Sequence, residues 1–192
     1  MSKAAMLVLL LFAAQVVSCS RNETAPQSSV ERGKYLVALG GCNDCHTPKV
    51  TGPNNALIPD NTKLLSGHLE NAPQPAWSVG DMQKGVAVVA NSSLTAWAGP
   101  WGVSFATNLT PDKATGLGEW SEESFIQVAR TGKHQGQPNG RDILPPMPWF
   151  NMKDLTDADL KAMWAYLRSV PPVQNQVPLP VPPAAAPAGA QG

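Results

Sequence analysis

The chain has 192 residues, of which only 15% are charged, and its 14 basic and 14 acidic side chains give a formal net charge of zero. No basic patch favours nucleic acid as a partner, and no acidic block favours a cationic one. Neither a glycine-rich nucleotide loop nor a Ser/His/Asp arrangement stands out. A chain of this length, without its terminal segments, is expected to form one domain.

Residues 1–19 have the pattern of an export signal. Lys3 precedes an apolar run over residues 6–17, which is shorter than the ~20 apolar residues of an ordinary transmembrane helix. The run Val-Val-Ser-Cys19 resembles a bacterial lipobox, so we expect Cys19 to carry lipid, which also leaves no free thiol in an oxidising compartment. A non-lipidated signal peptide that is cut near Ser18 is the alternative. Ser20 is not the aspartate that commonly marks inner-membrane retention, which favours the outer membrane.

A flexible tether is expected over residues 20–28, which are polar and lack periodicity, and the domain over residues 29–170. Ser28 and Glu31 form a capping-box pattern that predicts a helix start, and Gly40 predicts its end. The apolar face of this helix is supplied by Tyr35, Leu36 and Leu39. The sequence therefore predicts a first helix directly before the most informative motif of the chain.

That motif is Gly41-Cys42-Asn43-Asp44-Cys45-His46, a C-x-x-C-H run that is the signature of covalent haem attachment. The thiols of Cys42 and Cys45 can add to the haem vinyl groups as thioethers, and His46 then lies under the iron. A redox C-x-x-C would sit in a βαβ context, and a zinc site would need further Cys or His pairs. Neither context is visible, and the single motif predicts one haem c.

The segment between residues 47 and 107 is long and rich in Gly, Pro and Asn. Its strand signals are weak. Residues 86–90 form a short apolar run, and Gly99-Pro100 can turn the chain between residues 94–97 and 101–105 as a small hairpin.

Two further helices are expected. Ser121 caps the first, Trp120 and Phe125 have hydrophobic-staple spacing around it, and Gly132 stops it. Thr156 caps the second, whose apolar positions repeat at i, i+3, i+4 and i+7 as Leu160, Met163, Trp164 and Leu167. Pro171-Pro172 end that helix, and the Pro/Ala-rich residues 171–192 are expected to form an extended or disordered tail with nothing to pack.

A haem iron needs a sixth ligand or an open site, and the candidates are Met82, Met147, Met152, His68 and His134. Met147 is the best of them because the flanking Pro145, Pro146 and Pro148 stiffen the segment and can hold a soft thioether against iron. The alternative is that Met147 only fills the core. His68 and His134 sit among Gly, Asn and Gln, so we expect both at the surface.

The order of helix, C-x-x-C-H, long loop, Met loop and final helix resembles a class I c-type cytochrome. The similarity is greater to bacterial cytochrome c domains found alone or as haem subunits beside periplasmic alcohol, aldose and related dehydrogenases. It covers about residues 30–172. The matching stretches are residues 98–105, 108–112, 115–120, 146–149, 155–157 and 166–169.

The resemblance implies a mostly α, class I cytochrome c fold with a long Gly/Pro-rich insertion that can hold a small β-hairpin. It also implies His46 and Met147 as axial iron ligands. Trp101, Trp120 and Trp149 lie inside the matching stretches, so we expect them to form walls of the haem pocket. In related cytochromes the first and last helices pack closely, which here predicts Gly33 and Tyr35 against Trp164.

The resulting hypothesis is an exported, lipid-anchored, mono-haem electron carrier on the periplasmic side of the membrane, without catalytic residues of its own. Its partners would be redox proteins, such as a periplasmic dehydrogenase or a terminal oxidase or reductase. Dehydrogenase haem subunits usually carry several haem motifs, and this chain carries one. The alternatives are such a haem subunit, or a haem-based ligand-binding or sensor protein with a displaceable sixth ligand.

Overall fold

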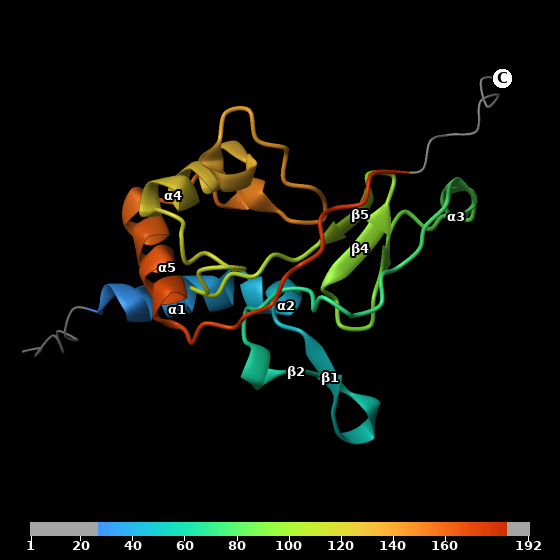
Figure 1. Ribbon diagram of the computed structural model, residues 1–192, viewed down its shortest axis with the longest axis horizontal. Coiled ribbons are helices and arrows are strands. Elements are labelled where there is room, and N and C mark those ends of the chain that lie inside the picture. The colour runs from blue at the N-terminus through green and yellow to red at the C-terminus, as the bar shows by residue number, and fades with distance from the viewer. Residues whose placement is uncertain (1–26, 184–192) are drawn as a thin grey trace, which may run out of the picture.

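Helices α1 (Ser29–Leu39) and α5 (Asp157–Ser169) cross at one end of the computed structural model, which describes residues 27–183 (Figure 1). Helix α4 (Glu122–Thr131) packs beside α5. All three helices begin at the predicted caps, Ser28, Ser121 and Thr156, each of which accepts a backbone N–H. The expected signal, Cys19 with its expected lipid, and residues 20–26 of the expected tether lie outside the described residues.

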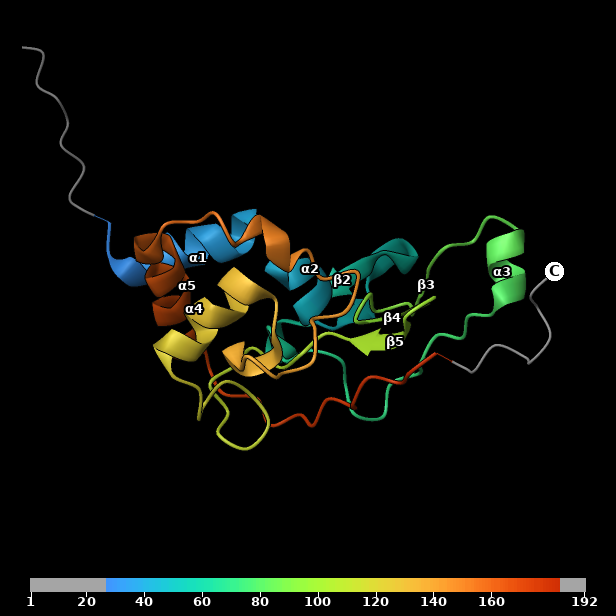
Figure 2. The ribbon, with the colours of Figure 1, turned by 90° about the horizontal axis from the view of Figure 1, so that it is seen from above.

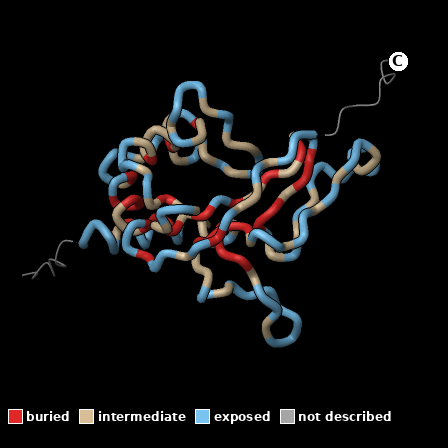
Figure 3. The backbone as a smooth tube through the Cα atoms, viewed as in Figure 1, coloured by how far each residue is buried: buried red, intermediate tan, exposed pale blue. Residues whose placement is uncertain are grey.

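The main core forms where these three helices meet, and Figure 3 shows the buried segments gathering there and along the sheet. The three helices contribute to it the large apolar side chains of Leu36, Phe125, Leu160, Met163, Trp164 and Leu167. Arg32 Nε donates to Asp159 Oδ1 over 2.9 Å and ties α1 to α5 at the rim. No helix within residues 27–183 combines the length and apolar character that a membrane span needs.

Gly33 allows α1 and α5 to approach closely. A Cβ built at Gly33 would lie 1.9 Å from the Ala162 carbonyl oxygen and 2.8 Å from the Tyr166 Cβ. The close helix contact expected at Gly33 is therefore present, but the expected partner, Trp164, is wrong. Trp164 instead packs on Phe125 at a ring distance of 5.6 Å, because it points from the other side of α5 toward α4.

The insertion, the Gly/Pro-rich segment between residues 47 and 107, contains two small antiparallel sheets. Strands β1 (Lys49–Thr51) and β2 (Leu57–Pro59) form an exposed hairpin, and β3 (Val89–Ala90), β4 (Ala96–Gly99) and β5 (Gly102–Phe105) form a three-stranded sheet. Gly99 pairs with Gly102 at the turn where the sequence predicts a hairpin. The short helix α3 (Val79–Gln83) projects at the end of the molecule away from α5 (Figure 2).

Short 3-10 turns connect these elements. They span Pro53–Asn55, Asn61–Lys63, His134–Gly136 and Trp149–Asn151.

His68 is fully buried, so its expected place at the surface is wrong. Its Nδ1 lies 2.9 Å from Thr95 Oγ1, and its ring packs against Phe105 at 4.9 Å. The Gly/Asn-rich sequence around His68 is typical of a solvated loop, but the strands β4 and β5 fold over it. His68 is a core residue of the insertion.

The expectation that the Pro/Ala-rich tail has nothing to pack is wrong for residues 171–183, which run along the domain to β5 (Figure 1). Asn175 is 9% exposed, and its side-chain amide donates to the carbonyls of Ser66 and His68, both over 2.8 Å. Val181 exchanges two backbone hydrogen bonds with Val103 of β5. Residues 171–183, the C-terminal strap, are thus extended and held by polar contacts. The spacing of apolar residues in the sequence does not predict such contacts. The rest of the tail lies outside the described residues.

We predict that Gly33→Ala lowers the free energy of unfolding by about 3 kcal/mol, because the added methyl group meets the α5 backbone and overpacks the helix crossing. Thermal and urea unfolding measure the effect. Gly80→Ala in α3 is the matched control, since its Cβ would have Ser78 Oγ at 3.5 Å as its nearest neighbour and should be tolerated. Equal stability of the two variants would contradict the close crossing.

Candidate haem site

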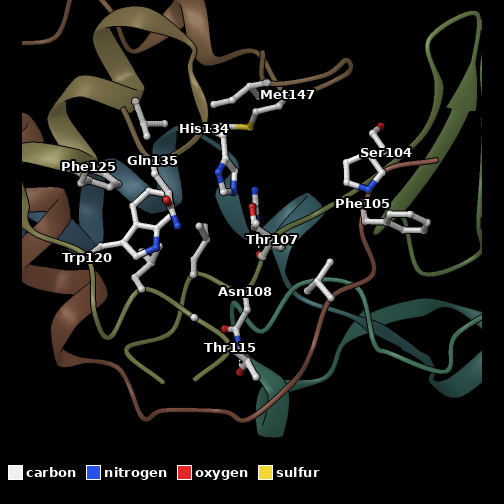
Figure 4. Close-up of a pocket in the computed structure, with 18 of the residues that line it drawn as sticks. Ser104, Phe105, Thr107, Asn108, Thr115, Trp120, Phe125, His134, Gln135 and Met147 are labelled. Atoms are coloured by element: carbon white, nitrogen blue, oxygen red, sulfur yellow. Dashed lines mark hydrogen bonds between the residues drawn. The ribbon is translucent and has the colours of Figure 1, made fainter. Parts of the chain in front are cut away.

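A cavity of about 360 Å³ lies between α4, α5, the helix α2 (Cys42–His46), the segment after β5 and the C-terminal strap (Figure 4). Its walls are mainly apolar and include Leu109, Leu117, Phe125, Val128, Ile143 and Leu167. An apolar hollow of this kind suits a flat, largely hydrophobic cofactor whose few polar partners are specifically placed.

His46 has one ring nitrogen engaged and the other free for a ligand. It is 6% exposed, and its Nδ1 lies 2.7 Å from the Thr107 carbonyl oxygen. A carbonyl only accepts, so Nδ1 carries the hydrogen and Nε2 of the neutral ring keeps its lone pair. Burial lowers the pKa of His46 and favours that neutral form. This arrangement, a donor to a backbone carbonyl on one nitrogen, is the one that metal-bound histidines use.

The helix α2 places the two thiols on one side of a single helical turn, since Cys42 and Cys45 are three residues apart. Gly41 precedes it with φ +66°, a left-handed conformation that favours glycine. Cys42 lines the cavity, whereas Cys45 is partly buried and is not among the lining residues. The two thiols form no disulfide.

The surroundings of these thiols do not suit a redox dithiol. Burial raises the pKa of the Cys42 thiol to about 11 and also raises the pKa of Cys45. A reactive C-x-x-C thiol has a depressed pKa, because its thiolate is the attacking species. Within residues 27–183 no group of three or more His, Cys, Asp or Glu side chains is placed to hold a metal ion, so the zinc alternative lacks a ligand set there.

Lys49 is a site residue that sequence reasoning missed. Its ammonium group donates to the carbonyls that end the short helix, those of Asn43, Asp44 and Thr47. Carbonyls at the end of a helix concentrate negative potential, and here only that of Asn43 also accepts a backbone N–H, from Thr47, so a cation there stabilises the turn. A lysine three residues after the motif histidine is the only sequence signal.

Met147 lines the cavity, and in Figure 4 its thioether lies at one end of the group of lining residues. Met152 lines the cavity too, whereas Met82 lies on α3 and is 49% exposed. The structure thus brings Met147 and Met152 to the same cavity as His46 and leaves out Met82 and His68.

His134 also lines this cavity, so its expected surface position is wrong. Figure 4 shows its ring among the lining residues together with Met147, and the ring meets Trp120 edge-on at 6.0 Å. The chain reverses after Gly132, and the backbone N–H of His134 donates to the Arg141 carbonyl over 2.9 Å. Burial lowers the pKa of His134.

Of the three tryptophans expected as pocket walls, Trp120 lines the cavity. Trp101 and Trp149 are not among the lining residues. The Trp101 indole donates to Ser104 Oγ over 3.2 Å, and Trp149 lies against Gly132, where a Cβ would be 2.3 Å from its ring. These two support the loops around the cavity.

Asn108 is a second site residue that sequence reasoning did not single out. It is 2% exposed, accepts from the Thr110 N–H over 3.0 Å, and donates to the Val173 carbonyl over 2.8 Å. It therefore joins the cavity wall to the C-terminal strap, of which residues 176–180 also line the cavity.

The residues present fit a covalently bound haem. Cys42 and Cys45 supply free thiols, His46 supplies an available nitrogen inside an apolar cavity, and Met147 supplies a sulfur donor to the same space. Soft sulfur and imidazole donors are the usual haem iron ligands of c-type cytochromes.

Comparison with known proteins also indicates a haem-binding protein. The family model "Cytochrome c" matches residues 30–171. The chain is 30% identical to a nicotinate dehydrogenase subunit of Pseudomonas putida, with 78% of this chain and 9% of that protein covered. It is 28% identical to the gluconate 2-dehydrogenase cytochrome c subunit of Pantoea cypripedii (79% and 26% covered). It is also 27% identical to the fructose dehydrogenase cytochrome subunit of Gluconobacter japonicus (94% and 31% covered).

The chain spans less than a third of the length of each of these relatives. The family model covers most of the chain, and Cys42 and His46 of the C-x-x-C-H helix line a cavity that could hold a haem. The chain belongs to the cytochrome c family, whose members bind haem c covalently and transfer electrons.

Proposed function

We propose that this chain is an exported mono-haem electron carrier in which Cys42 and Cys45 hold the haem and His46 and Met147 ligate its iron. The observation that carries the proposal is the His46–Thr107 hydrogen bond, which leaves Nε2 available inside a cavity that Met147 also lines. Haem c, when bound, supplies a one-electron couple at its iron. No catalytic side chain is needed for that role.

The protein supplies ligation, orientation and exclusion of water. The Thr107 carbonyl holds the tautomer and orientation of His46 and makes its free nitrogen a better donor. The Met147 thioether favours the reduced iron and so raises the reduction potential. Apolar side chains around the cavity, such as Leu109, Phe125 and Leu167, keep water out and raise the potential further.

For the partner we propose a redox protein of the periplasm, with a dehydrogenase as the first candidate. The support is that the three relatives from Pseudomonas, Pantoea and Gluconobacter are dehydrogenase subunits, two of them named as cytochrome subunits. This chain holds one C-x-x-C-H motif, so we propose that it passes single electrons as a separate haem subunit or carrier. We place it on the periplasmic side, anchored through lipid on Cys19, on the strength of its signal pattern.

We predict that replacing both Cys42 and Cys45 by alanine abolishes haem that survives denaturation, because no thioether can form. Denaturing gels stained for haem peroxidase activity measure it. Each single variant should stain far more weakly than the unmodified protein. Cys19→Ala is the control and should keep full staining; staining of the double variant would contradict covalent attachment through these thiols.

We predict that Met147→Ala opens the iron to carbon monoxide, which the unmodified ferrous protein should bind slowly or not at all, and lowers the reduction potential. Optical spectra under carbon monoxide and a redox titration measure both effects. Met82→Ala, on an exposed helix away from the cavity, is the matched control and should change neither. Met152→Ala should also leave the spectrum intact.

His134 lines the same cavity and is therefore the competing candidate for the sixth ligand, so a His134→Ala variant belongs in this experiment. If the unmodified protein already binds carbon monoxide readily, the carrier proposal loses to a ligand-binding function. If Met147→Ala changes nothing while His134→Ala opens the iron, then His134 is the ligand and the assignment to Met147 is wrong.

We predict that Cys19→Ala moves the protein from the membrane fraction to the soluble periplasmic fraction, because a lipoprotein-type anchor is lost. A single acyl chain binds only marginally, so stable anchoring depends on the several chains such an anchor carries. Cell fractionation with immunodetection measures it. Unchanged membrane retention would show that something other than lipid on Cys19 holds the protein.

A further inference from the structure

The β3–β4–β5 sheet of the insertion contacts residues 144–147, the Met147 loop, through one short hydrogen bond. Ser104, on β5, is 7% exposed, and its Oγ lies 2.5 Å from the carbonyl oxygen of Pro145. Pro145 stands two residues before Met147. Ser104 and Met147 both line the cavity and appear together in Figure 4.

The single hydrogen of the Ser104 hydroxyl is committed to that contact. Trp101 Nε1 donates to Ser104 Oγ over 3.2 Å, which occupies a lone pair and not the hydrogen. The other acceptor in reach, the Trp97 carbonyl, is 3.5 Å away and so a much poorer partner than Pro145 at 2.5 Å. The indole of Trp101 therefore orients the hydroxyl toward the loop.

The Met147 loop has few other restraints. Before it, the Ile143 N–H donates to the Gly132 carbonyl over 2.8 Å, and after it the Asn151 N–H donates to the Pro148 carbonyl over 3.0 Å. Pro145 and Pro146 have no N–H and are exposed. Within the described part of the chain, the bond from Ser104 is the only hydrogen bond that links residues 144–147 to another segment.

The other end of this contact is firmly held. Ser104 pairs with Trp97 in the β4–β5 ladder, and its neighbour Val103 exchanges two backbone hydrogen bonds with Val181, over 2.8 and 2.9 Å. The strand β5 is thus fixed from both sides, by the hairpin and by the C-terminal strap. It can act as a rigid support for a loop that has few hydrogen bonds to the rest of the chain.

We propose that Ser104 is a positioning residue that holds the Pro145–Met147 turn so that the Met147 thioether stays at the sixth ligand position. The proposal rests on the proposed ligation by Met147. It gives the β4–β5 hairpin of the insertion a defined role in setting how often the sixth position opens. Loss of one ordinary hydrogen bond should raise the open population about fivefold.

The test compares Ser104→Thr with Ser104→Val in the haem-loaded full chain. The two side chains have the same shape and both suit a strand, but only threonine keeps the hydroxyl. The readouts are the association rate of carbon monoxide with the ferrous protein and the weak long-wavelength sulfur-to-iron band of the ferric protein. The rate reports the open fraction, and the band reports the bond itself.

We expect the valine variant to bind carbon monoxide about fivefold faster than the threonine variant, with a weaker sulfur-to-iron band. The threonine variant should match the unmodified protein. Ser66→Ala is the control, because Ser66 Oγ is buried without any hydrogen-bond partner, so its loss removes a hydroxyl but no bond. It should leave both readouts unchanged.

Equal rates and bands in the threonine and valine variants, with the band present in the unmodified protein, would overturn the role of Ser104 alone. Absence of the band from the unmodified protein would instead overturn ligation by Met147, and the role of Ser104 with it. If the valine variant does not accumulate, Ser104→Ala compared with Ser66→Ala distinguishes the same two outcomes.

Discussion

The hydrogen bond between His46 Nδ1 and the Thr107 carbonyl is the contact on which the rest of the site depends. It joins the end of α2 to the segment that follows β5, residues 61 apart in the chain, and it leaves the second nitrogen of His46 available inside the cavity. The Gly67 N–H donates to the carbonyl of His46 over 2.8 Å, which fixes the backbone of the same residue. The imidazole is therefore oriented by the protein before any ligand is considered, which is how second partners of metal-bound histidines act.

The insertion and the C-terminal strap support this segment from outside. Asn108 and Asn175 bond to the strap and to the insertion respectively, and Val181 pairs with β5, so the strap closes over the cavity wall that carries Thr107. The polar side chains in this region satisfy backbone groups that no regular helix or sheet uses. The Gly/Pro-rich insertion is thus part of the frame of the site, and the C-terminal strap holds it in place.

Much of the helical frame could be predicted from the sequence because its signals are local. Ser28, Ser121 and Thr156 cap helices through side-chain contacts three residues away, and Gly132 adopts the left-handed conformation that ends α4. The C-x-x-C-H motif places its three groups on a single turn. Each of these features depends on residues close together in the chain.

The features that sequence reasoning misplaced depend on contacts between residues far apart. His68 is buried because Thr95 and Phe105, far along the chain, fold over it, and its flanking residues give no hint of that. Asn175 holds the strap through an amide in a Pro-rich run without apolar periodicity. The place of His134 in the wall of the cavity follows from a chain reversal after Gly132. A local sequence pattern does not predict such contacts, because they form only when distant elements pack together.

The most direct test of the central claim, that His46 and Met147 together ligate one haem iron, is iron K-edge X-ray absorption of the unmodified protein in both oxidation states. Ligation by these two residues predicts a sulfur atom in the iron shell beside the porphyrin and histidine nitrogens, retained on reduction. A shell of nitrogens alone, whether six-coordinate through His134 or five-coordinate, would contradict it.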